Sequence, residues 1–328
     1  MKSSIDFARG ARIVTMSAVL GVAAGAAAAE DYADYPSEQI RLIIPYSPGG
    51  ATDIIFRLFA NEAEEELGVS IVPVNMAGAS ATAGSREVRD ADPDGYTLLG
   101  SHEVIAAARI SGVVDYSFDA FETVSLITQT PNMATINSSL EIETLDEFRD
   151  YVVENPGELA WGITPGSTSH FFVAMMMESL GLDQDALRYI DYEGTGDAIT
   201  AVQRGEIAGT MTNYASAQSQ IEEGTFVALA VSHDERLPQL PDTPTFNELG
   251  YDMVNATSRG FFAPAGTPEP IIERLADAFR ATAESPELQE RIEDELGSIV
   301  RYMGPEEQRA FFEAAEERLE GLADLLQM

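Results

Sequence analysis

The 328-residue chain carries 55 Asp and Glu against 19 Lys and Arg, a formal net charge of −36, and contains no cysteine. A protein this acidic has no basic face to attract phosphates, which excludes nucleic-acid binding. The lack of cysteine excludes a disulfide framework and a lipid anchor on cysteine. Acidic residues are spread along the whole chain, so we interpret the charge as a solvated surface suited to high salt, in preference to a site for a cationic ligand.

The first 29 residues have the pattern of a signal peptide. Lys2, Arg9 and Arg12 precede an Ala-rich apolar run over 13–29, which ends in small residues of the A-x-A type. The alternative is a retained membrane anchor, but the run is short and weakly hydrophobic for that role. We therefore expect cleavage near Glu30 and export to the periplasm.

From residue 39 onward, short apolar runs alternate with helical patterns, which indicates an α/β fold. The repeating unit is a strand, a turn rich in glycine or hydroxyl residues, and a helix. We expect strands at 39–45, 96–99, 159–163, 187–192 and 226–231, and helices through 54–63, 102–109, 169–180 and 197–205.

Helix starts are also visible toward the C-terminus. Thr267 and Ser285 are expected to cap helices with Pro268 and Pro286 at their first positions. From Pro305 the pattern predicts an amphipathic helix that covers the core of the first lobe.

Two extended segments, 124–129 and 254–262, are each followed by proline and are predicted to be connectors. If both cross between lobes, residues 30–131 and 254–328 form lobe 1 and residues 132–253 form lobe 2.

The sharpest motif is PYSPGGATD at 45–53, between a predicted strand and a predicted helix. Gly49 and Gly50 allow positive φ and close approach of a ligand, and Thr52 or Asp53 is expected to cap the helix. Free N–H groups at a helix start form an anion site. The alternative is an ordinary tight turn, since the motif lacks the Lys of a phosphate-binding P-loop.

A second motif, TPGSTSH at 164–170, also lies between a strand and a helix. Thr164, Ser167, Thr168 and Ser169 supply hydroxyls that can donate to a carboxylate, and His170 stands at the helix start. The alternative is simple N-capping by one of the hydroxyl residues at 167–169. If the two motifs lie in separate lobes and face each other, they can bind an anion between them.

An enzyme is the main alternative from a different class. The three histidines, His102, His170 and His233, form no H-E-x-x-H arrangement, and the chain has no G-x-S-x-G motif. We therefore predict no catalytic activity, no cofactor and no metal, and keep a hydrolase as the less favoured interpretation.

Five stretches, in order along the chain, resemble the receptors of tripartite tricarboxylate transporters, also called the Bug family of periplasmic solute-binding proteins. They are YPSEQIRLIIPYSPGGATD (35–53), ADPDGYTLL (91–99), GSTSH (166–170), LAVSHDERLPQLPDTPTFNELG (229–250) and FFAPAGTPEPIIERL (261–275). The resemblance implies a two-lobed Venus-flytrap fold of the class II type, with a ligand cleft between the lobes.

The resemblance also implies which residues bind the ligand. They are Ser47, Gly49, Gly50, Ala51, Thr52 and Asp53 in the first motif, Ser167, Thr168, Ser169 and His170 in the second, and Ser101, Tyr192, Gly194 and Asn213 at the side of the pocket. To these we add Thr164 as a hydroxyl donor and Tyr46, which with Phe56 and Met76 can form an apolar wall or belong to the core. Where the family often has N-R-P-G-A-G, this chain reads NMAGAS at 75–80.

The function implied is that of an extracytoplasmic receptor for a small organic carboxylate, such as a di- or tricarboxylate. It would deliver this ligand to the membrane subunits of a tripartite tricarboxylate transporter, and we expect a monomer. The alternative partner is a membrane signalling protein for which the chain is the ligand-sensing subunit.

Overall fold

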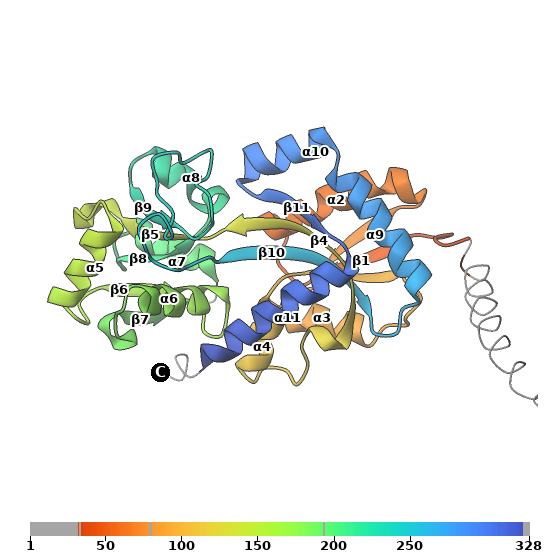
Figure 1. Ribbon diagram of the computed structural model, residues 1–328, viewed down its shortest axis with the longest axis horizontal. Helices are drawn as coiled ribbons and strands as arrows, with labels where there is room; N and C mark the ends of the chain where they lie inside the picture. The colour runs from red at the N-terminus through yellow and green to blue at the C-terminus, as the bar shows by residue number, and fades with distance from the viewer. Residues whose placement is uncertain (1–31, 33, 79–80, 193, 324–328) are drawn as a thin grey trace, which may run out of the picture.

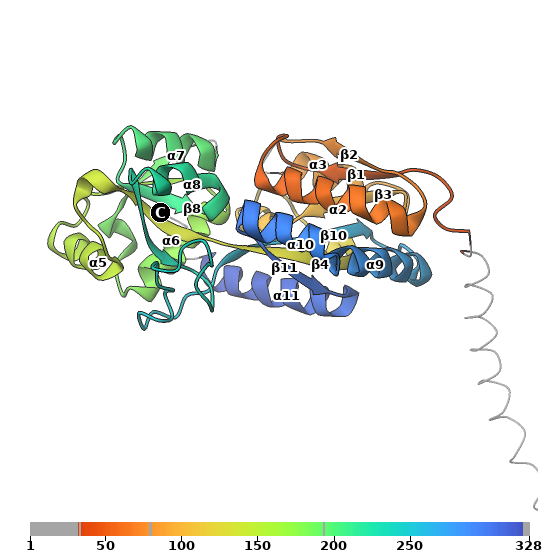
Figure 2. The ribbon, with the colours of Figure 1, turned by 90° about the horizontal axis from the view of Figure 1, so that it is seen from above.

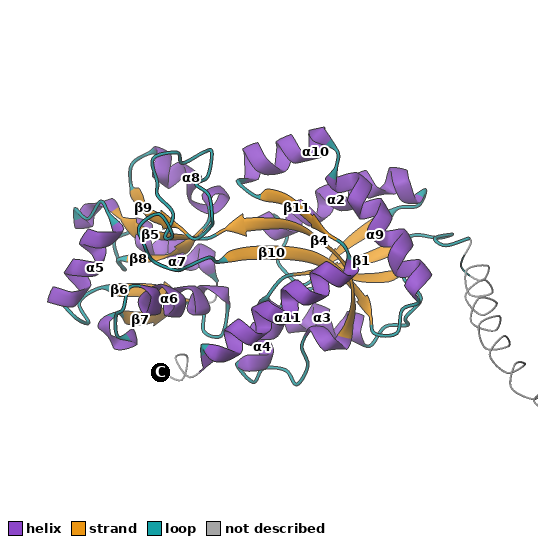
Figure 3. Ribbon diagram, in the orientation of Figure 1, coloured by secondary structure: helices purple, strands orange, loops and turns teal. Residues whose placement is uncertain are grey.

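The computed structural model describes residues 32, 34–78, 81–192 and 194–323. Their strands form two separate sheets flanked by helices, so the chain folds into two lobes (Figure 1 and Figure 3). This confirms the predicted α/β, two-lobed fold. The predicted signal peptide, residues 1–29, lies outside the described residues, and within them no helix is long and apolar enough to cross a membrane.

Lobe 1 is built on a six-stranded mixed sheet with the order β11-β4-β10-β3-β1-β2. Strand β1 pairs in parallel with β2 and β3, whereas β10 pairs antiparallel with β3 and β4. The strands are β1 (Ile40–Ile44), β2 (Ile71–Asn75), β3 (Thr97–Ser101), β4 (Phe121–Pro131), β10 (Ala256–Pro264) and β11 (Ile299–Met303). The helices are α2 (Ala51–Leu67), α3 (Thr82–Arg89), α4 (Val104–Ile110), α9 (Glu269–Ala283), α10 (Pro286–Glu290) and α11 (Pro305–Gly321).

Helices cover both faces of the lobe 1 sheet. They are needed there because successive residues of a strand point to opposite faces, and both sets are apolar in the central strands. On β1, Leu42 and Ile44 pack with α2 and α9, while Ile43 between them packs with α3, α4 and α11. On β10, Phe261 likewise faces α2 and α9, and Phe262 faces α4 and α11. We call these two sides of the sheet the α2 face and the α4 face.

Lobe 2 has a five-stranded sheet with the order β7-β6-β8-β5-β9. Strand β6 is parallel to β7 and β8, and β5 is antiparallel to β8 and β9. The strands are β5 (Met133–Asn137), β6 (Ala160–Ile163), β7 (Arg188–Asp191), β8 (Gly209–Thr212) and β9 (Phe226–Val231). The helices are α5 (Leu145–Glu154), α6 (Thr168–Ser179), α7 (Thr195–Gln203) and α8 (Tyr214–Glu222).

The chain crosses between the sheets twice. After β4 it enters β5, and after β9 it returns through residues 232–255 to β10, so β4 and β10 run side by side toward lobe 2 (Figure 1 and Figure 2). Where they cross, Asn132 N donates to Asn255 O at 3.1 Å, and Ser232 Oγ donates to Asn132 O at 2.7 Å. This arrangement supports the division into lobe 1 and lobe 2 that we propose.

Two of the predicted helix starts differ in outcome. Ser285 caps α10, with its hydroxyl accepting from Leu288 N at 3.4 Å, as expected. Thr267 does not cap α9: Pro268 is the N-cap residue, and the Thr267 hydroxyl donates to Pro264 O at 2.7 Å. The helix starts one residue later than the Thr-Pro signal indicates, because Thr267 closes the preceding turn.

Candidate ligand-binding site

The first loop, residues 45–53, connects the buried strand β1 to helix α2. Gly49 has φ +86°, in the left-handed region that favours glycine, whereas Gly50 has φ −78° and an extended backbone. The expectation of positive φ at both glycines is therefore wrong for Gly50. A Cβ atom placed on Gly50 would meet no atom within 4 Å.

Helix α2 begins without a side-chain cap. Gly50 is the N-cap residue and Ala51 the first helical residue, so the expectation that Thr52 or Asp53 caps the helix is wrong. The N–H groups of Gly50, Ala51 and Thr52 have no acceptor among the described residues. Unpaired donors at the positive end of a helix dipole are suited to an anion.

Asp53 holds the first loop in this shape. Its carboxylate, only 3% exposed, accepts from Gly49 N at 2.9 Å, Arg57 Nε at 2.9 Å and Asn75 Nδ2 at 2.8 Å. Burial raises the pKa of Asp53, but the hydrogen bonds from Arg57, Gly49 and Asn75 outweigh it, so the pKa lies below its usual value. The carboxylate is ionised and turned into the protein, where it positions the loop.

The second loop, residues 164–170, connects β6 to α6 and uses its hydroxyls on itself. Ser167 caps α6: its Oγ accepts from Ser169 N at 3.3 Å and donates to Thr164 O at 2.8 Å. Ser169 is 2% exposed, and its Oγ accepts from Thr164 N at 2.9 Å. The capping alternative is confirmed for Ser167.

His170 completes this internal network. Its Nδ1 accepts from Gly166 N at 3.3 Å, and burial lowers the pKa of the ring against a smaller opposing effect of Asp191. Among the donors of the second loop that have no described hydrogen-bond partner are the buried hydroxyl of Thr164, and both the hydroxyl and the N–H of Thr168 at the start of α6. These groups are the ones that this loop can offer to a ligand.

Tyr46 and Ser101 lie together where β1 and β3 end. Tyr46 Oη is 3.2 Å from Ser101 Oγ, and the Tyr46 ring stacks on His102 with centroids 4.9 Å apart. Burial raises the pKa of Tyr46, so its hydroxyl stays protonated. Phe56 is fully buried against Phe261, which places it in the core and not in a ligand wall.

The remaining predicted residues also follow strands. Gly194 is the N-cap of α7 and has no side chain to cap it, while Asn213 caps α8 by accepting from Ser216 N at 3.0 Å. Tyr192 is half-buried after β7, and Ser47 is exposed. In the described parts of the chain, no hydrogen bond joins the first loop to the second.

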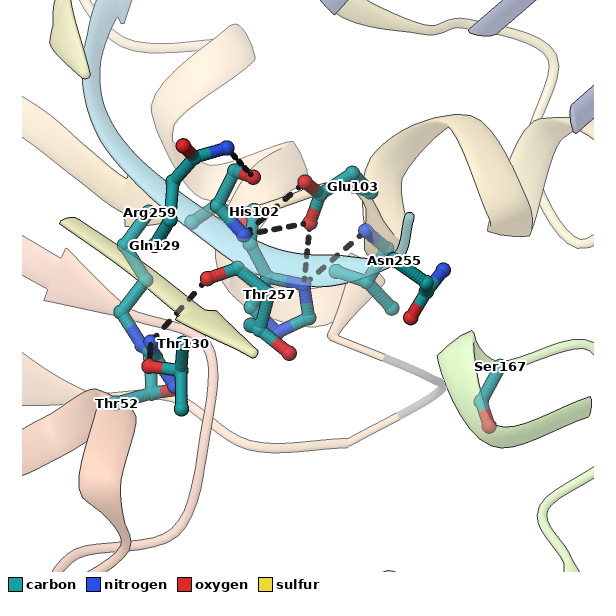
Figure 4. A network of polar contacts seen from close by, with 12 residues as sticks. Thr52, His102, Glu103, Gln129, Thr130, Ser167, Asn255, Thr257 and Arg259 are labelled. Carbon is teal, nitrogen blue, oxygen red and sulfur yellow. Dashed lines mark hydrogen bonds and ion pairs between the residues drawn. The ribbon is translucent and has the colours of Figure 1, made fainter. Parts of the chain in front are cut away.

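Sequence reasoning missed Arg259, which lies on β10 and is 2% exposed. Its Nε donates to Thr52 Oγ1 at 2.9 Å, and its Nη1 donates to Thr130 Oγ1 at 2.5 Å and to Thr257 O at 3.4 Å (Figure 4). The signal was present in the sequence as the one charged residue of the predicted connector 254–262.

Two more buried titratable residues, His102 and Glu103, lie close enough to this guanidinium to feel its charge. Both Glu103 oxygens accept from Ser258 N, at 3.0 and 3.1 Å. Burial raises the pKa of Glu103 to about 7, opposed by the hydrogen bonds from Ser258 and the charge of Arg259. Burial, aided by Arg259, lowers the pKa of His102 to about 3, so that ring is neutral. Arg259 itself keeps its proton at neutral pH, although burial lowers its pKa to about 10.

A cavity of about 300 Å³ opens on the α4 face of β4 and β10. Ser258 lines it, whereas Arg259 points to the α2 face, as alternation along β10 requires. Of the predicted ligand residues, Thr168 borders this cavity. We place the candidate site at the first loop instead, because that is where backbone donors are left unpaired beside a buried cation.

Two α/β lobes joined by crossing strands, with unpaired donors at strand ends, define a two-lobed solute-binding protein fold. A family model described as "Tripartite tricarboxylate transporter family receptor" matches residues 55–320. The chain belongs to this family, which confirms the resemblance found in the sequence.

Similar proteins agree with this assignment. A UPF0065 protein of Bordetella pertussis is 32% identical over 79% of this chain and 81% of its own length. MatC from Rhodopseudomonas palustris, solved with bound malate, is 28% identical with a TM-score of 0.76, covering 88% of this chain and 100% of its own. A second R. palustris protein, solved with adipate, is 25% identical with a TM-score of 0.78, covering 89% and 98%.

Proposed function

We propose that the protein is a periplasmic receptor that captures a small organic carboxylate between its lobes and delivers it to the membrane subunits of a tripartite tricarboxylate transporter. Export by a signal peptide at residues 1–29 and action as a monomer are parts of this proposal. The observation that carries it is the set of unpaired N–H donors of Gly50, Ala51 and Thr52 at the start of α2.

The chemistry of these donors favours a carboxylate. Each hydrogen bond to a charged group contributes about 1.5–3 kcal/mol, so two or three of them hold an anion without a surface cation. In lobe 2 the Thr164 hydroxyl and the Thr168 N–H are available for the far end of the ligand. A ligand that joins donors of both lobes stabilises a closed form, and β4 and β10 are the hinge about which closure would occur.

The ligand class is supported by two relatives of the same fold. MatC was solved with malate and the second R. palustris protein with adipate, both of them dicarboxylates. We therefore propose a dicarboxylate or related acid as the ligand of this chain.

A thermal-shift screen followed by calorimetry tests the proposal. The chain without residues 1–29 is measured with malate, adipate, citrate and benzoate, and with the neutral diamides of the dicarboxylates as matched controls. We expect at least one acid to raise the melting temperature and to bind saturably, with no chemical product, while its amide binds much more weakly. If no acid stabilises the protein, or if an acid is converted, the proposal is wrong.

The transporter partner requires a separate experiment. Immobilised receptor, loaded with the acid found in the screen, should retain transporter membrane subunits from solubilised membranes, and the unloaded receptor should retain less. Retention of a membrane kinase in their place would favour the sensing alternative.

A further inference from the structure

Arg259 is an unusual cation for its surroundings. It is 2% exposed on β10, and no carboxylate of the described residues forms an ion pair with it. Its three hydrogen bonds go to two threonine hydroxyls and one carbonyl, all neutral acceptors. A buried charge without a counter-charge is costly, so the site gains when an anion arrives.

The other charges near Arg259 form no ion pair with it. Asp53, in the same loop as Thr52, is paired with Arg57 at 2.9 Å. Glu103 acts electrostatically on Arg259, but both its oxygens accept from Ser258 N, and burial raises its pKa to about 7. His102 is neutral. The positive charge of Arg259 therefore acts on the region around the first loop.

Thr52 connects this charge to the unpaired donors. Its Oγ1 accepts from Arg259 Nε, so its own hydroxyl hydrogen is free to donate elsewhere. Thr52 lies in the first turn of α2, beside the unpaired N–H groups of Gly50 and Ala51. Figure 4 shows the guanidinium directed at Thr52 and Thr130, while Ser167 of lobe 2 lies apart from this network. In the guanidinium, Nη2 makes no hydrogen bond to the described residues.

We propose that Arg259 is a positioning residue for the ligand anion: it fixes and polarises the Thr52 hydroxyl and supplies a positive charge, without an ion-pair partner among the described residues, that makes the first loop select a carboxylate over its neutral analogue. This inference rests on the proposed function and goes beyond it, because backbone donors alone also bind neutral oxygen atoms.

The test compares an acid with its own amide. Among malate, adipate and citrate, the acid that stabilises the wild-type chain most is titrated by calorimetry, together with its amide, into wild type, Arg259→Gln and Arg291→Gln. Arg291 is the control because its substitution changes the net charge equally, and its exposed side chain lies outside the candidate site. Unfolding of each variant is measured in parallel.

We expect Arg259→Gln to weaken acid binding roughly tenfold to a hundredfold, as loss of a charge-assisted interaction predicts, and to leave amide binding unchanged. Arg291→Gln should change acid binding by less than about threefold, because an exposed charge is screened. If Arg259→Gln keeps the wild-type ratio of acid to amide affinity, Arg259 is structural only and the proposal is overturned, whatever happens to the melting temperature.

Thr52→Val provides a second test, which does not depend on folding with an altered buried charge. It removes the hydroxyl and keeps Arg259, and we expect about tenfold weaker acid binding. Unchanged acid affinity in Thr52→Val overturns the role assigned to the Arg259–Thr52 pair. If the wild-type chain binds none of the acids, the proposed function is wrong. If the wild-type chain binds an acid and Arg259→Gln binds it equally well, only the role of Arg259 is wrong, so the two failures are distinguishable.

Discussion

The first and second loops occupy equivalent places in their lobes, since each leads from a buried strand into a helix. The two loops differ in whether their hydrogen-bond donors are left free or are used within the loop. The first loop uses glycines, has no side-chain cap and leaves three N–H groups unpaired among the described residues, held in place by the buried carboxylate of Asp53. The second loop is rich in hydroxyls but turns those of Ser167 and Ser169 onto its own backbone. The loop with fewer hydroxyl side chains thus leaves more of its backbone hydrogen-bond donors free.

Removal of Asp53 should have the largest effect. Asp53→Ala deletes the acceptor shared by Gly49, Arg57 and Asn75, and should cost roughly 2–4 kcal/mol in the free energy of unfolding. Loss of a negative charge alone would favour an anion, so weaker carboxylate binding in this variant reports loss of loop shape. Denaturant unfolding and calorimetry measure both, with exposed Glu65→Ala on the same helix as control. Native carboxylate affinity in Asp53→Ala would show that the first loop keeps its shape without the Asp53 carboxylate.

The two glycines of the first loop should differ in their tolerance of a side chain. Gly49→Ala places a Cβ at φ +86° and should destabilise the protein by about 1–2 kcal/mol. Gly50→Ala has an allowed φ and open space around its Cβ, so only the weaker N-cap preference of Ala acts, and it should cost about 0.5 kcal/mol, less than Gly49→Ala. Equal effects in thermal unfolding would contradict the assigned backbone geometry.

In the second loop, removal of a serine hydroxyl should lower stability without changing carboxylate affinity. Ser169→Ala removes the acceptor for Thr164 N and should cost about 1 kcal/mol of stability, with carboxylate affinity changed less than about threefold. Thr168→Val is the matched variant, because the Thr168 side chain makes no hydrogen bond to the described residues and borders the cavity on the α4 face. A Ser169→Ala variant that is as stable as wild type but binds tenfold more weakly would show that the hydroxyl serves the ligand.

Much of the fold is readable from the sequence because buried strands and helix starts have local signals. The runs that predict β6 and β9 are continuous and apolar, that of β1 is interrupted only by exposed Arg41, and Ser285-Pro286 caps α10 as its pattern indicates. Short strands such as β8, GTMT, have no such signal, since pairing with β5 and β6 is what makes them extended.

The candidate site was predictable in position but not in detail. The motifs at 45–53 and 164–170 do lie at strand-to-helix junctions, yet the sequence does not show which donors are already used. Whether a serine hydroxyl faces a ligand or its own backbone depends on side-chain rotamers and on neighbours such as His170. Arg259 comes from 207 residues beyond Thr52, so only the pairing of β10 with the lobe 1 sheet brings them together.

The smallest effect we predict is a pH dependence of the second loop, through His170. Its Nδ1 accepts from Gly166 N and therefore must be unprotonated, and burial lowers its pKa below the ordinary 6.5. The unfolded chain then binds the proton first as the pH falls, so the stability contribution of His170 is complete above about pH 6.5 and is lost below it. His102 acts in the same direction. Glu103 acts in the opposite one, because the raised pKa of Glu103 makes stability fall as the pH rises toward 7.

The measurement is therefore a difference between two proteins: denaturant unfolding of wild type and His170→Gln at about pH 5 and about pH 8. Gln can still accept from Gly166 N but does not titrate, so wild type should lose stability relative to the variant at the lower pH. If the free energy of unfolding changes equally with pH in the two proteins, the neutral His170 ring does not stabilise the second loop.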